Sequence, residues 1–249
     1  MTHKLNEPLI KITPENTQEF TVEDAYIKYP KEEVDAVVAK VNYKKEKLSL
    51  PKEEDDPDIP TLYVFRHGQS TDNEKMVFGG WRDSGLTKSG KDAALVLADL
   101  LKDKKIQRLR SSDQRRSVDT MKHAMSKNKH ALELEIHRER RIRERNYGDL
   151  QGQSKMEWKL KEPELTHTYR RSWDNPPPNG ESIKMVVDRV EEFIKEIIPL
   201  MKQSNLNVAI ACHGNSFRGF RKHFENLTEE ETATVESPLA GDYAAYEIR

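Results

Sequence analysis

The sequence predicts a three-layer α/β/α sandwich with a mostly parallel central sheet. From residue 61 onward, short apolar runs typical of buried strands alternate with longer runs that have helical spacing. Two of the strand-like runs, 62–65 and 208–212, both end at a histidine followed by a glycine. In parallel sheets ligands bind beyond the carboxyl ends of the strands. If these two strands are parallel neighbours, both histidines reach the same edge of the sheet.

The expected strands are short apolar runs bounded by polar or turn-forming residues. The runs at 62–65 and 208–212 are wholly apolar, as expected of strands that are covered on both faces. The run at 133–137 has the weakest pattern. In chain order the expected strands are 62–65, 106–109, 133–137, 208–212 and 243–248.

Helices are expected where apolar residues recur at spacings of three and four. The clearest case is 182–200, in which seven apolar side chains, from Ile183 to Ile197, share one face. Residues 146–180 are expected to be loop-rich, because they contain Gly148, Gly152 and three consecutive prolines. The expected helices are 89–101, 114–126, 182–200 and 216–224.

The first 60 residues differ in composition from the rest and are expected to be an N-terminal extension or linker, partly ordered at most. They are rich in Lys, Glu and Pro, and the charge run at 51–57 is typical of a solvated linker. Val34, Val37, Val38 and Val41 have helical spacing. The segment is interpreted either as a loosely docked arm or as a segment that binds a partner or covers a site. Residues 61–249 form the expected catalytic domain.

Charge is unevenly distributed along this chain of 249 residues. Its formal net charge is −1, but residues 1–60 carry −5 and the remainder +4, and every arginine follows residue 65. An arginine-rich body suits small anions, whereas so weak a positive charge argues against nucleic acid as a partner. No apolar run approaches the ~20 residues that span a bilayer, so no membrane partner is expected.

Cysteine use and the N-terminus indicate the cytoplasm as the expected location. Cys212 is the single cysteine, so no disulfide forms within the chain, and no Cys/His spacing typical of zinc is present. The N-terminus has neither the apolar core of a secretory signal nor the arginines of a mitochondrial one.

The residues after the first strand suit phosphoryl chemistry. Arg66, His67 and Gly68 follow the strand directly. A neutral imidazole can attack a phosphoryl group and carry it as phosphohistidine, and neighbouring guanidinium groups keep the ring neutral. Gly68 permits close approach of the backbone. Taken alone, this tripeptide is a weak signal, because a lone histidine at a strand end is more often structural than catalytic.

Three further residues support the same interpretation. His213 follows the other apolar strand and begins a helix, where backbone N–H groups bind anions. Arg116 follows a strand end and offers a planar fork to phosphate, although a surface helix arginine is the alternative. Glu144 is a candidate for proton transfer, but the arginines around it, from Arg138 to Arg145, favour its ionised form.

With these residues in place, residues 61–249 resemble the histidine phosphatase superfamily, and more closely its cofactor-dependent phosphoglycerate mutases. The resemblance is carried by the run from Arg66 to Asn73, Gly80-Trp81, Glu144-Arg145, Arg170 to Pro178, and His213 to Gly219. The phosphatases of the superfamily share the paired histidines, whereas the Arg170 to Pro178 segment and the His-Gly-Asn-Ser ending are far more specific to the mutases. The resemblance implies an isomerase of glycolysis and gluconeogenesis that interconverts 3-phosphoglycerate and 2-phosphoglycerate, primed by 2,3-bisphosphoglycerate and without a metal.

The resemblance also implies roles for individual residues. His67 resembles the phosphorylated nucleophile, Glu144 the proton donor and acceptor, and His213 the stabiliser of the transition state. Arg66, Asn73, Arg116 and the Gly214 backbone resemble the clamp on the transferred phosphoryl group. Contacts to the carboxylate and second phosphate of the substrate are implied for Gly79, Gly80, Arg145, Tyr147, Lys155, Arg170, Arg171 and Asn215.

The chain departs from the family pattern at three places. Gln69 stands where glutamate is frequent, Gly79 replaces a small hydroxyl residue, and the stretch from Pro178 to Glu181 is short. Two alternatives stay open: a histidine-type phosphatase acting on small phosphate monoesters, and a non-catalytic module whose first 60 residues recruit a partner. The partner expected is a small phosphoglycerate, and the sequence leaves homo-oligomerisation open.

Overall fold

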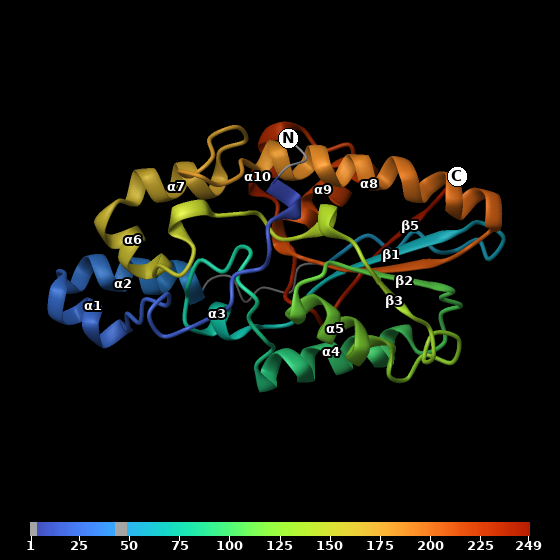
Figure 1. The fold of residues 1–249 in the computed structure, drawn as a ribbon, viewed down its shortest axis with the longest axis horizontal. Coiled ribbons are helices and arrows are strands. Elements are labelled where there is room, and N and C mark those ends of the chain that lie inside the picture. The colour runs from blue at the N-terminus through green and yellow to red at the C-terminus, as the bar shows by residue number, and fades with distance from the viewer. Residues whose placement is uncertain (1–3, 43–48) are drawn as a thin grey trace.

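A central sheet organises the computed structural model, which describes residues 4–42 and 49–249. Five strands of the described chain form it, in the order β3-β2-β4-β1-β5 (Figure 1). The pairs β1–β4, β2–β4 and β2–β3 are parallel, and β5 runs antiparallel to β1, which confirms the predicted mostly parallel sheet. The strands are β1 Thr61–Arg66, β2 Arg108–Ser111, β3 Ile136–Arg138, β4 Val208–Cys212 and β5 Ala244–Glu247.

The two strands that end in histidine are parallel neighbours. Arg66 at the end of β1 lies opposite Cys212 at the end of β4. His67 and His213 come next on the two strands, and the backbone N–H of His67 donates to the carbonyl of Cys212 at 3.0 Å. The conditional prediction is therefore confirmed, and both imidazoles reach one edge of the sheet.

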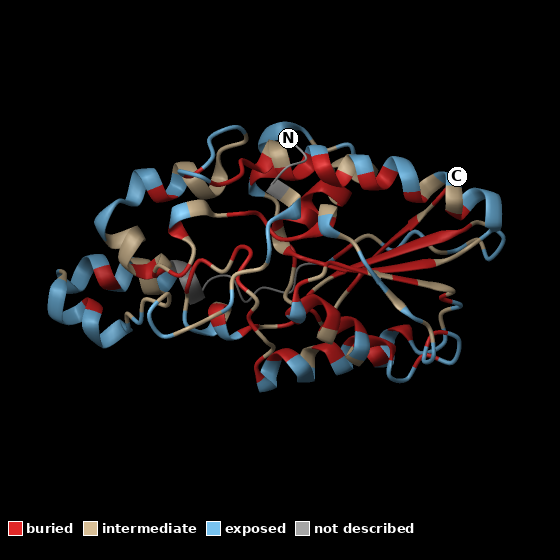
Figure 2. Ribbon diagram, in the orientation of Figure 1, coloured by how far each residue is buried: buried red, intermediate tan, exposed pale blue. Residues whose placement is uncertain are grey.

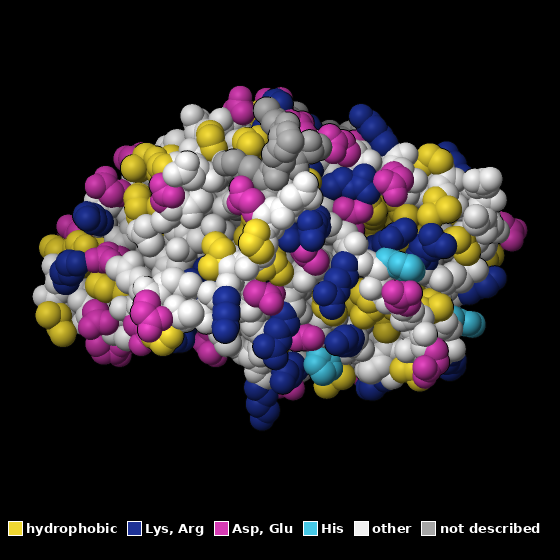
Figure 3. All heavy atoms as spheres, viewed as in Figure 1, with side chains coloured by type: hydrophobic (Ala, Val, Ile, Leu, Met, Phe, Trp, Pro, Cys, Tyr) yellow, Lys and Arg dark blue, Asp and Glu magenta, His cyan; other side chains and the backbone are white. Residues whose placement is uncertain are grey.

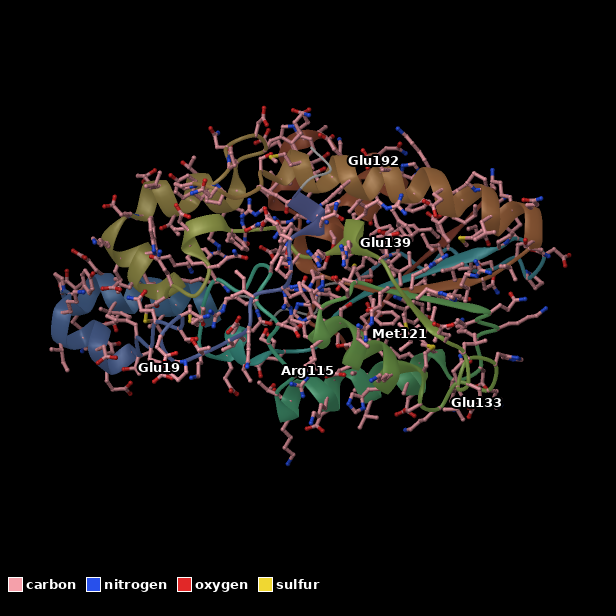
Figure 4. All side chains as sticks on the ribbon, in the orientation of Figure 1. Glu19, Arg115, Met121, Glu133, Glu139 and Glu192 are labelled. Atoms are coloured by element: carbon pink, nitrogen blue, oxygen red, sulfur yellow. The ribbon has the colours of Figure 1, made fainter. Side chains whose placement is uncertain are left out.

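Helices cover both faces of the sheet and bury it, so the predicted three layers are confirmed (Figure 2). On one face, α4 (Lys88–Leu101) and α5 (Arg115–Met125) enclose a core that includes Phe65 and Leu97. Met121 of α5 points from its helix toward the sheet (Figure 4). On the other face, α8 (Ile183–Ser204) and α9 (Gly214–Glu225) enclose a second core around Phe193.

The segment predicted to be loop-rich contains two helices, so that prediction is wrong. They are α6 (Lys155–Lys161) and α7 (Pro163–Arg171), beside a 3₁₀ turn at Gly148–Leu150. Each helix is short, and its start depends on one residue: the Ser154 side chain caps α6, and Pro163 occupies the first turn of α7. The glycines and prolines used for the prediction lie outside both helices.

Some predicted boundaries shift by a few residues. The second strand begins at Arg108 rather than at Ile106, which is buried but precedes the strand. The long helix continues past Pro199 and ends at an Asn205 C-cap in the left-handed region. The remaining elements are 3₁₀ turns at Lys4–Asn6 and Arg140–Ile142, and helices α1 Val22–Lys28, α2 Lys31–Asn42, α3 Thr71–Glu74 and α10 Glu229–Thr234.

Helices α1 and α2 of the N-terminal arm, residues 4–42, pack beside α6 (Figure 1). Ala25 and Val34 are buried against Met156, with Val37 and Val38 beside them, so the valine spacing does form the helix face it predicted. The side chain of Val41 lies outside the described part of the chain. The arm therefore covers the flank of the region that carries α6.

Acidic and basic side chains mix on the face drawn in Figure 3. In the parts of the chain that the structure describes, no helix combines the length and apolar content needed to cross a bilayer.

Candidate active site

A cavity of about 1030 Å³ opens at the carboxyl ends of β1 and β4. The loops that follow these strands line it, together with α6, α7 and the segment 236–242. All of the predicted site residues line this cavity except His213 and Arg145, which are fully buried just behind its wall. Those that line it are Arg66, His67, Asn73, Gly79, Gly80, Arg116, Glu144, Tyr147, Lys155, Arg170, Arg171, Gly214 and Asn215.

The two histidines lie against each other at the base of the cavity. Their ring centroids are 4.9 Å apart, and both side chains are buried. His67 Nδ1 lies 2.6 Å from the Gly68 carbonyl, an acceptor, so the proton sits on Nδ1 and Nε2 keeps its lone pair. Burial, with the charges of Arg116 and Arg66, lowers the pKa of His67 well below its ordinary value. The His67 ring is therefore neutral, as a nucleophile must be.

Glycine is required immediately after His67. A Cβ on Gly68 would lie 2.2 Å from the carbonyl oxygen of Gly90, which is too close for any side chain. The loop after β1 can therefore pack closely against the start of α4.

His213 presents one nitrogen without a partner. Its Nε2 lies 2.6 Å from the Ser112 hydroxyl, while its buried Nδ1 has no hydrogen-bond partner among the described residues. Burial and the charge of Arg116, with His67 beside it, lower the pKa of His213 well below its usual value. Sequence reasoning did not single out Ser112, although it lies only four residues before Arg116.

Arg116 is held rigidly beside His67. Its Nε lies 3.3 Å from His67 Nε2, and its terminal nitrogens donate to the carbonyls of Arg82 at 2.7 Å and Gly80 at 2.9 Å. Arg66 donates from Nη1 to the Ser237 carbonyl at 3.0 Å, while its buried Nε has no partner in the described chain. Two guanidinium groups thus flank the neutral ring.

Glu144 is buried, and one of its two carboxylate oxygens accepts several hydrogen bonds. Its Oε1 accepts from the Arg145 backbone at 2.8 Å and from the Asn215 backbone and side chain at 3.1 and 2.8 Å. Burial acts to raise the pKa of Glu144, but these hydrogen bonds and the charges of Arg66 and Arg116 lower it overall. In the free site the carboxyl is therefore ionised, as its arginine-rich neighbourhood in the sequence indicated.

His67, Glu144 and His213 also have the donor types of a metal site. Their ligand atoms lie within 4.8 Å of one another. Arg66 and Arg116 flank the same atoms and lower the pKa values of both histidines by repulsion of positive charge. That repulsion opposes a metal cation equally and favours an anion in the same place.

A second cluster of cations surrounds Tyr147 farther along the cavity. The Arg145 guanidinium lies 4.5 Å from the centre of the Tyr147 ring, and its three buried nitrogens have no hydrogen-bond partner among the described residues. Burial opposes ionisation of Tyr147, but Arg145, with Arg170 and Lys155, lowers its pKa to about 7. Burial, with Arg170, lowers the pKa of Lys155 to about 8. Buried donors without partners mark a place for an anionic ligand.

Arg218 and Glu236 also line the cavity, and sequence reasoning missed both. Arg171 of α7 donates to the Glu236 carboxylate, and Arg218 Nη2 lies 3.7 Å from it. Arg218 belongs to the His213 to Gly219 run, so the resemblance contained a signal for it. No sequence pattern marked Glu236.

The N-terminal arm supports the cavity from behind. The buried Arg82 guanidinium pairs with Asp72 at 3.0 Å and donates to the Asn16 carbonyl at 2.6 Å and the Thr17 hydroxyl at 2.7 Å. Gln18 accepts from the backbone of Ser154, which begins α6, at 2.9 Å. The arm thus touches both the loop that holds Arg116 and the helix that starts at Lys155.

Gln69, one departure from the family pattern, does not reach the cavity. Its side-chain oxygen accepts from the Thr87 hydroxyl at 2.9 Å, at the start of α4. Gly79, the second departure, does line the cavity.

Comparison with known proteins agrees with this geometry. The model of the histidine phosphatase superfamily (branch 1) matches residues 62–243. Phosphoglycerate mutase 1 of Saccharomyces cerevisiae is 35% identical over 208 residues, which cover 72% of this chain and 84% of that protein. The 2,3-bisphosphoglycerate-dependent phosphoglycerate mutase of Parvibaculum lavamentivorans is 38% identical over 186 residues, covering 71% and 86%.

Solved structures share the fold. A mycobacterial glucosyl-3-phosphoglycerate phosphatase superposes with a TM-score of 0.66 at 22% identity, covering 75% of this chain and 92% of that one. Bacillus stearothermophilus YhfR gives the same TM-score and identity, covering 75% and 90%. At this identity the likeness concerns the fold alone.

Proposed function

The chain belongs to the histidine phosphatase superfamily (branch 1) and, within it, to the family of 2,3-bisphosphoglycerate-dependent phosphoglycerate mutases; from this premise we propose that it interconverts 3-phosphoglycerate and 2-phosphoglycerate. The observation that carries the proposal is that one cavity joins two groups of residues. The inner group is His67, Glu144, Arg66 and Arg116, with the buried His213 ring behind His67, and the outer group is the cation cluster around Tyr147. A ligand with two anionic ends can occupy both groups at once.

His67 acts as the phosphoryl carrier in this proposal. Its Nε2 lone pair forms the N–P bond while the bond from phosphorus to the departing hydroxyl oxygen breaks. Arg66 and Arg116 hold the charge on the non-bridging oxygens. With the Ser112 hydroxyl donating to Nε2, the neutral His213 ring carries its proton on Nδ1 and donates it as a hydrogen bond to the same oxygens.

Glu144 moves the proton. The negative charge of a bound phosphate raises the pKa of a neighbouring carboxyl, so Glu144 becomes protonated only when the substrate is bound. It then donates the proton to the departing oxygen, and takes it back from the other hydroxyl when the phosphoryl group returns from His67. Asn215 holds the carboxylate in place for both steps.

The cavity suits 2,3-bisphosphoglycerate, the primer that the names of the related mutases imply. The buried nitrogens without partners on Arg66, Arg145 and Arg170 fit a ligand with two phosphates and a carboxylate. Lys155 and Arg171 would hold it alongside them at the outer end. When bound, 2,3-bisphosphoglycerate supplies the phosphoryl group that first loads His67.

The domain organisation and location are part of the same proposal. Residues 61–249 form the catalytic domain, and residues 1–60 are an extension whose described part packs on it. The reaction needs a small-molecule partner only, and its place in glycolysis and gluconeogenesis puts the protein in the cytoplasm.

A coupled mutase assay, with and without 2,3-bisphosphoglycerate, tests the proposal beside an assay of phosphate release. We expect isomerisation that depends on the primer, and an acid-labile phosphoryl label that His67→Ala abolishes. The exposed His137 provides the control, since His137→Ala should keep both activity and label. Phosphate release without isomerisation would select the alternative, a histidine-type phosphatase of small monoesters. Labelling retained in His67→Ala would refute the assigned nucleophile.

The outer cations separate the two functions in a second experiment. We expect Arg171→Ala to lower mutase turnover more than the hydrolysis of a small monophosphate, because only the phosphoglycerate has an outer anionic group for Arg171 to hold. Equal losses in the two reactions would count against a bound outer anion.

A further inference from the structure

Glu236 places a carboxylate in a cavity that is otherwise built to bind anions. Its side chain is 33% exposed, and it faces the outer arginines, which we define as Arg171 and Arg218. Arg171 donates directly to the carboxylate, and Arg218 Nη2 lies 3.7 Å away. The ion pair stands where the outer anionic group of a substrate would meet the same two guanidinium groups.

The backbone that carries Glu236 is fixed on both sides. Arg218 Nε donates to the Val235 carbonyl at 2.9 Å, and Arg221 donates to the carbonyl of Glu236 itself at 2.8 Å. Arg66 donates to the next carbonyl, that of Ser237, at 3.0 Å. Only rotation of its own side chain can therefore move the carboxylate away from Arg171.

The charge of Glu236 acts on several cations at once. Burial and the charge of Arg171 lower the pKa of Arg218 to about 10, and Glu236 opposes that shift. Burial and Arg171 also lower the pKa of Arg170, which Glu236 again opposes. Without the carboxylate, these cations would present more uncompensated positive charge to an anionic ligand.

We propose that Glu236 determines specificity by acting as an internal counter-anion for the outer arginines, with which the outer anionic group of a ligand must compete. The inference rests on the proposed function and extends it to the choice among ligands. Repulsion grows with the charge of the outer group, so Glu236 weakens binding of a doubly charged phosphate more than that of a carboxylate. A bisphosphorylated ligand is therefore held less tightly than the arginines alone would hold it.

Equilibrium binding to the full chain tests this. Dissociation constants for 2,3-bisphosphoglycerate, 3-phosphoglycerate and inorganic phosphate are measured by calorimetry in a His67→Asn background, which prevents phosphoryl transfer. Glu236→Gln keeps an oxygen that can accept from Arg171 and removes only the charge. We expect it to tighten binding of the bisphosphate about tenfold and of the monophosphate about threefold, with phosphate changed less than twofold.

Two further variants make the result specific to Glu236. Glu236→Asp keeps the charge and should restore the parent ratios among the three dissociation constants. Glu230→Gln removes a charge from an exposed position on α10 and should leave those ratios unchanged.

Each remaining outcome decides against the inference. Weaker binding in Glu236→Gln would mean that the carboxylate positions Arg171 rather than competes for it. An equal change for all three ligands would mean a general effect of charge. If the ligands bind and Glu236→Gln leaves the ratios of their dissociation constants unaltered, this inference fails alone. If none of them binds to the parent variant, the proposed function fails with it.

Discussion

Arg116 Nε lies 3.3 Å from His67 Nε2, the ring atom that keeps its lone pair. The guanidinium cannot leave this position easily, because the carbonyls of Gly80 and Arg82 accept from its other nitrogens. The Arg116 side chain therefore has two effects. It helps to keep the His67 imidazole neutral, and it lies beside the ring nitrogen to which phosphorus becomes bonded.

Replacing Arg116 should affect both rate and pH dependence. In Arg116→Gln we expect phosphorylation of His67 to slow by about 10²–10³, the usual cost of losing one donor to a transition-state oxygen. Arg116 lowers the pKa of His67, so its loss raises that pKa toward its ordinary value of about 6.5. As pH falls, the His67 ring should therefore become protonated, and labelling should be lost, at a higher pH than in the parent protein. Single-turnover labelling between pH 5 and 8 measures both effects.

Arg115 supplies the matched control for this prediction. It is the preceding residue on α5, with a side chain that is 67% exposed and directed to Asp119. Arg115→Gln should leave the rate and the pH profile unchanged. If labelling of Arg116→Gln is lost at the same low pH as labelling of the parent protein, burial alone holds His67 neutral.

The role of Glu144 predicts a dependence on the leaving group. Glu144→Gln cannot donate a proton, so transfer from phosphoglycerate, whose departing oxygen needs one, should fall by about 10²–10⁴. Transfer from para-nitrophenyl phosphate should fall less than tenfold, because nitrophenolate departs without a proton. The measurement is the single-turnover rate of His67 phosphorylation from each of the two donors.

Glu139 offers the comparison variant. It accepts from Arg141 at 2.9 Å, lies near β3 and α8, and does not line the cavity (Figure 4). Glu139→Gln should not distinguish the two donors. Equal losses for both donors in Glu144→Gln would remove Glu144 from proton transfer and leave it an electrostatic role.

The residues that sequence could place are those attached to regular elements. His67 and His213 each follow a run of apolar residues, and the pairing of β1 with β4 then brings the two together without any further information. Arg116 could be placed because it opens the helix that follows β2. In each case a local pattern places the residue at the end of a strand or the start of a helix. The pairing of parallel strands then determines which other residues lie beside it.

The features that sequence could not place depend on contacts between distant loops. Glu236 sits in an irregular segment, and only the fold reveals that it meets Arg171, 65 residues away. The pairing of Arg82 with Thr17 spans 65 residues as well, and neither residue belongs to a periodic pattern. For α6 and α7 the difficulty is length, since helices of seven and nine residues hold too few turns for a spacing to repeat.

The N-terminal arm should contribute to stability through Arg82. The partly buried Thr17 hydroxyl accepts from Nη2 of the buried Arg82 at 2.7 Å. Thr17→Val removes that acceptor at nearly constant volume, so we expect the free energy of unfolding to fall by about 1–3 kcal/mol, the cost of an unsatisfied buried donor. Urea denaturation measures the loss, and Thr17→Ser should restore most of it. An unchanged urea midpoint in Thr17→Val would mean that water replaces the Thr17 hydroxyl as the acceptor for Arg82.

Lys155 should make substrate binding sensitive to alkaline pH. Burial, with Arg170, lowers the pKa of its ammonium group to about 8, so its positive charge is lost as pH rises through that value. Substrate phosphate is already mostly dianionic at pH 7, so we expect KM for 3-phosphoglycerate to rise about five- to tenfold between pH 7 and 9. Lys155→Arg should flatten the rise because arginine stays charged, while Lys161→Arg, at an exposed position on α6, should not.

Tyr147 provides the sharper form of the same test. Its negative charge, when ionised, raises the pKa of Lys155, against the larger effect of burial. Tyr147→Phe removes that support, so the rise in KM should begin at a lower pH than in the parent protein. The opposite result is that the rise in KM disappears in Tyr147→Phe and persists in Lys155→Arg. The titrating group would then be the Tyr147 phenol, whose own pKa is about 7. The rise in KM would come from repulsion of the substrate by phenolate rather than from the loss of an ammonium charge.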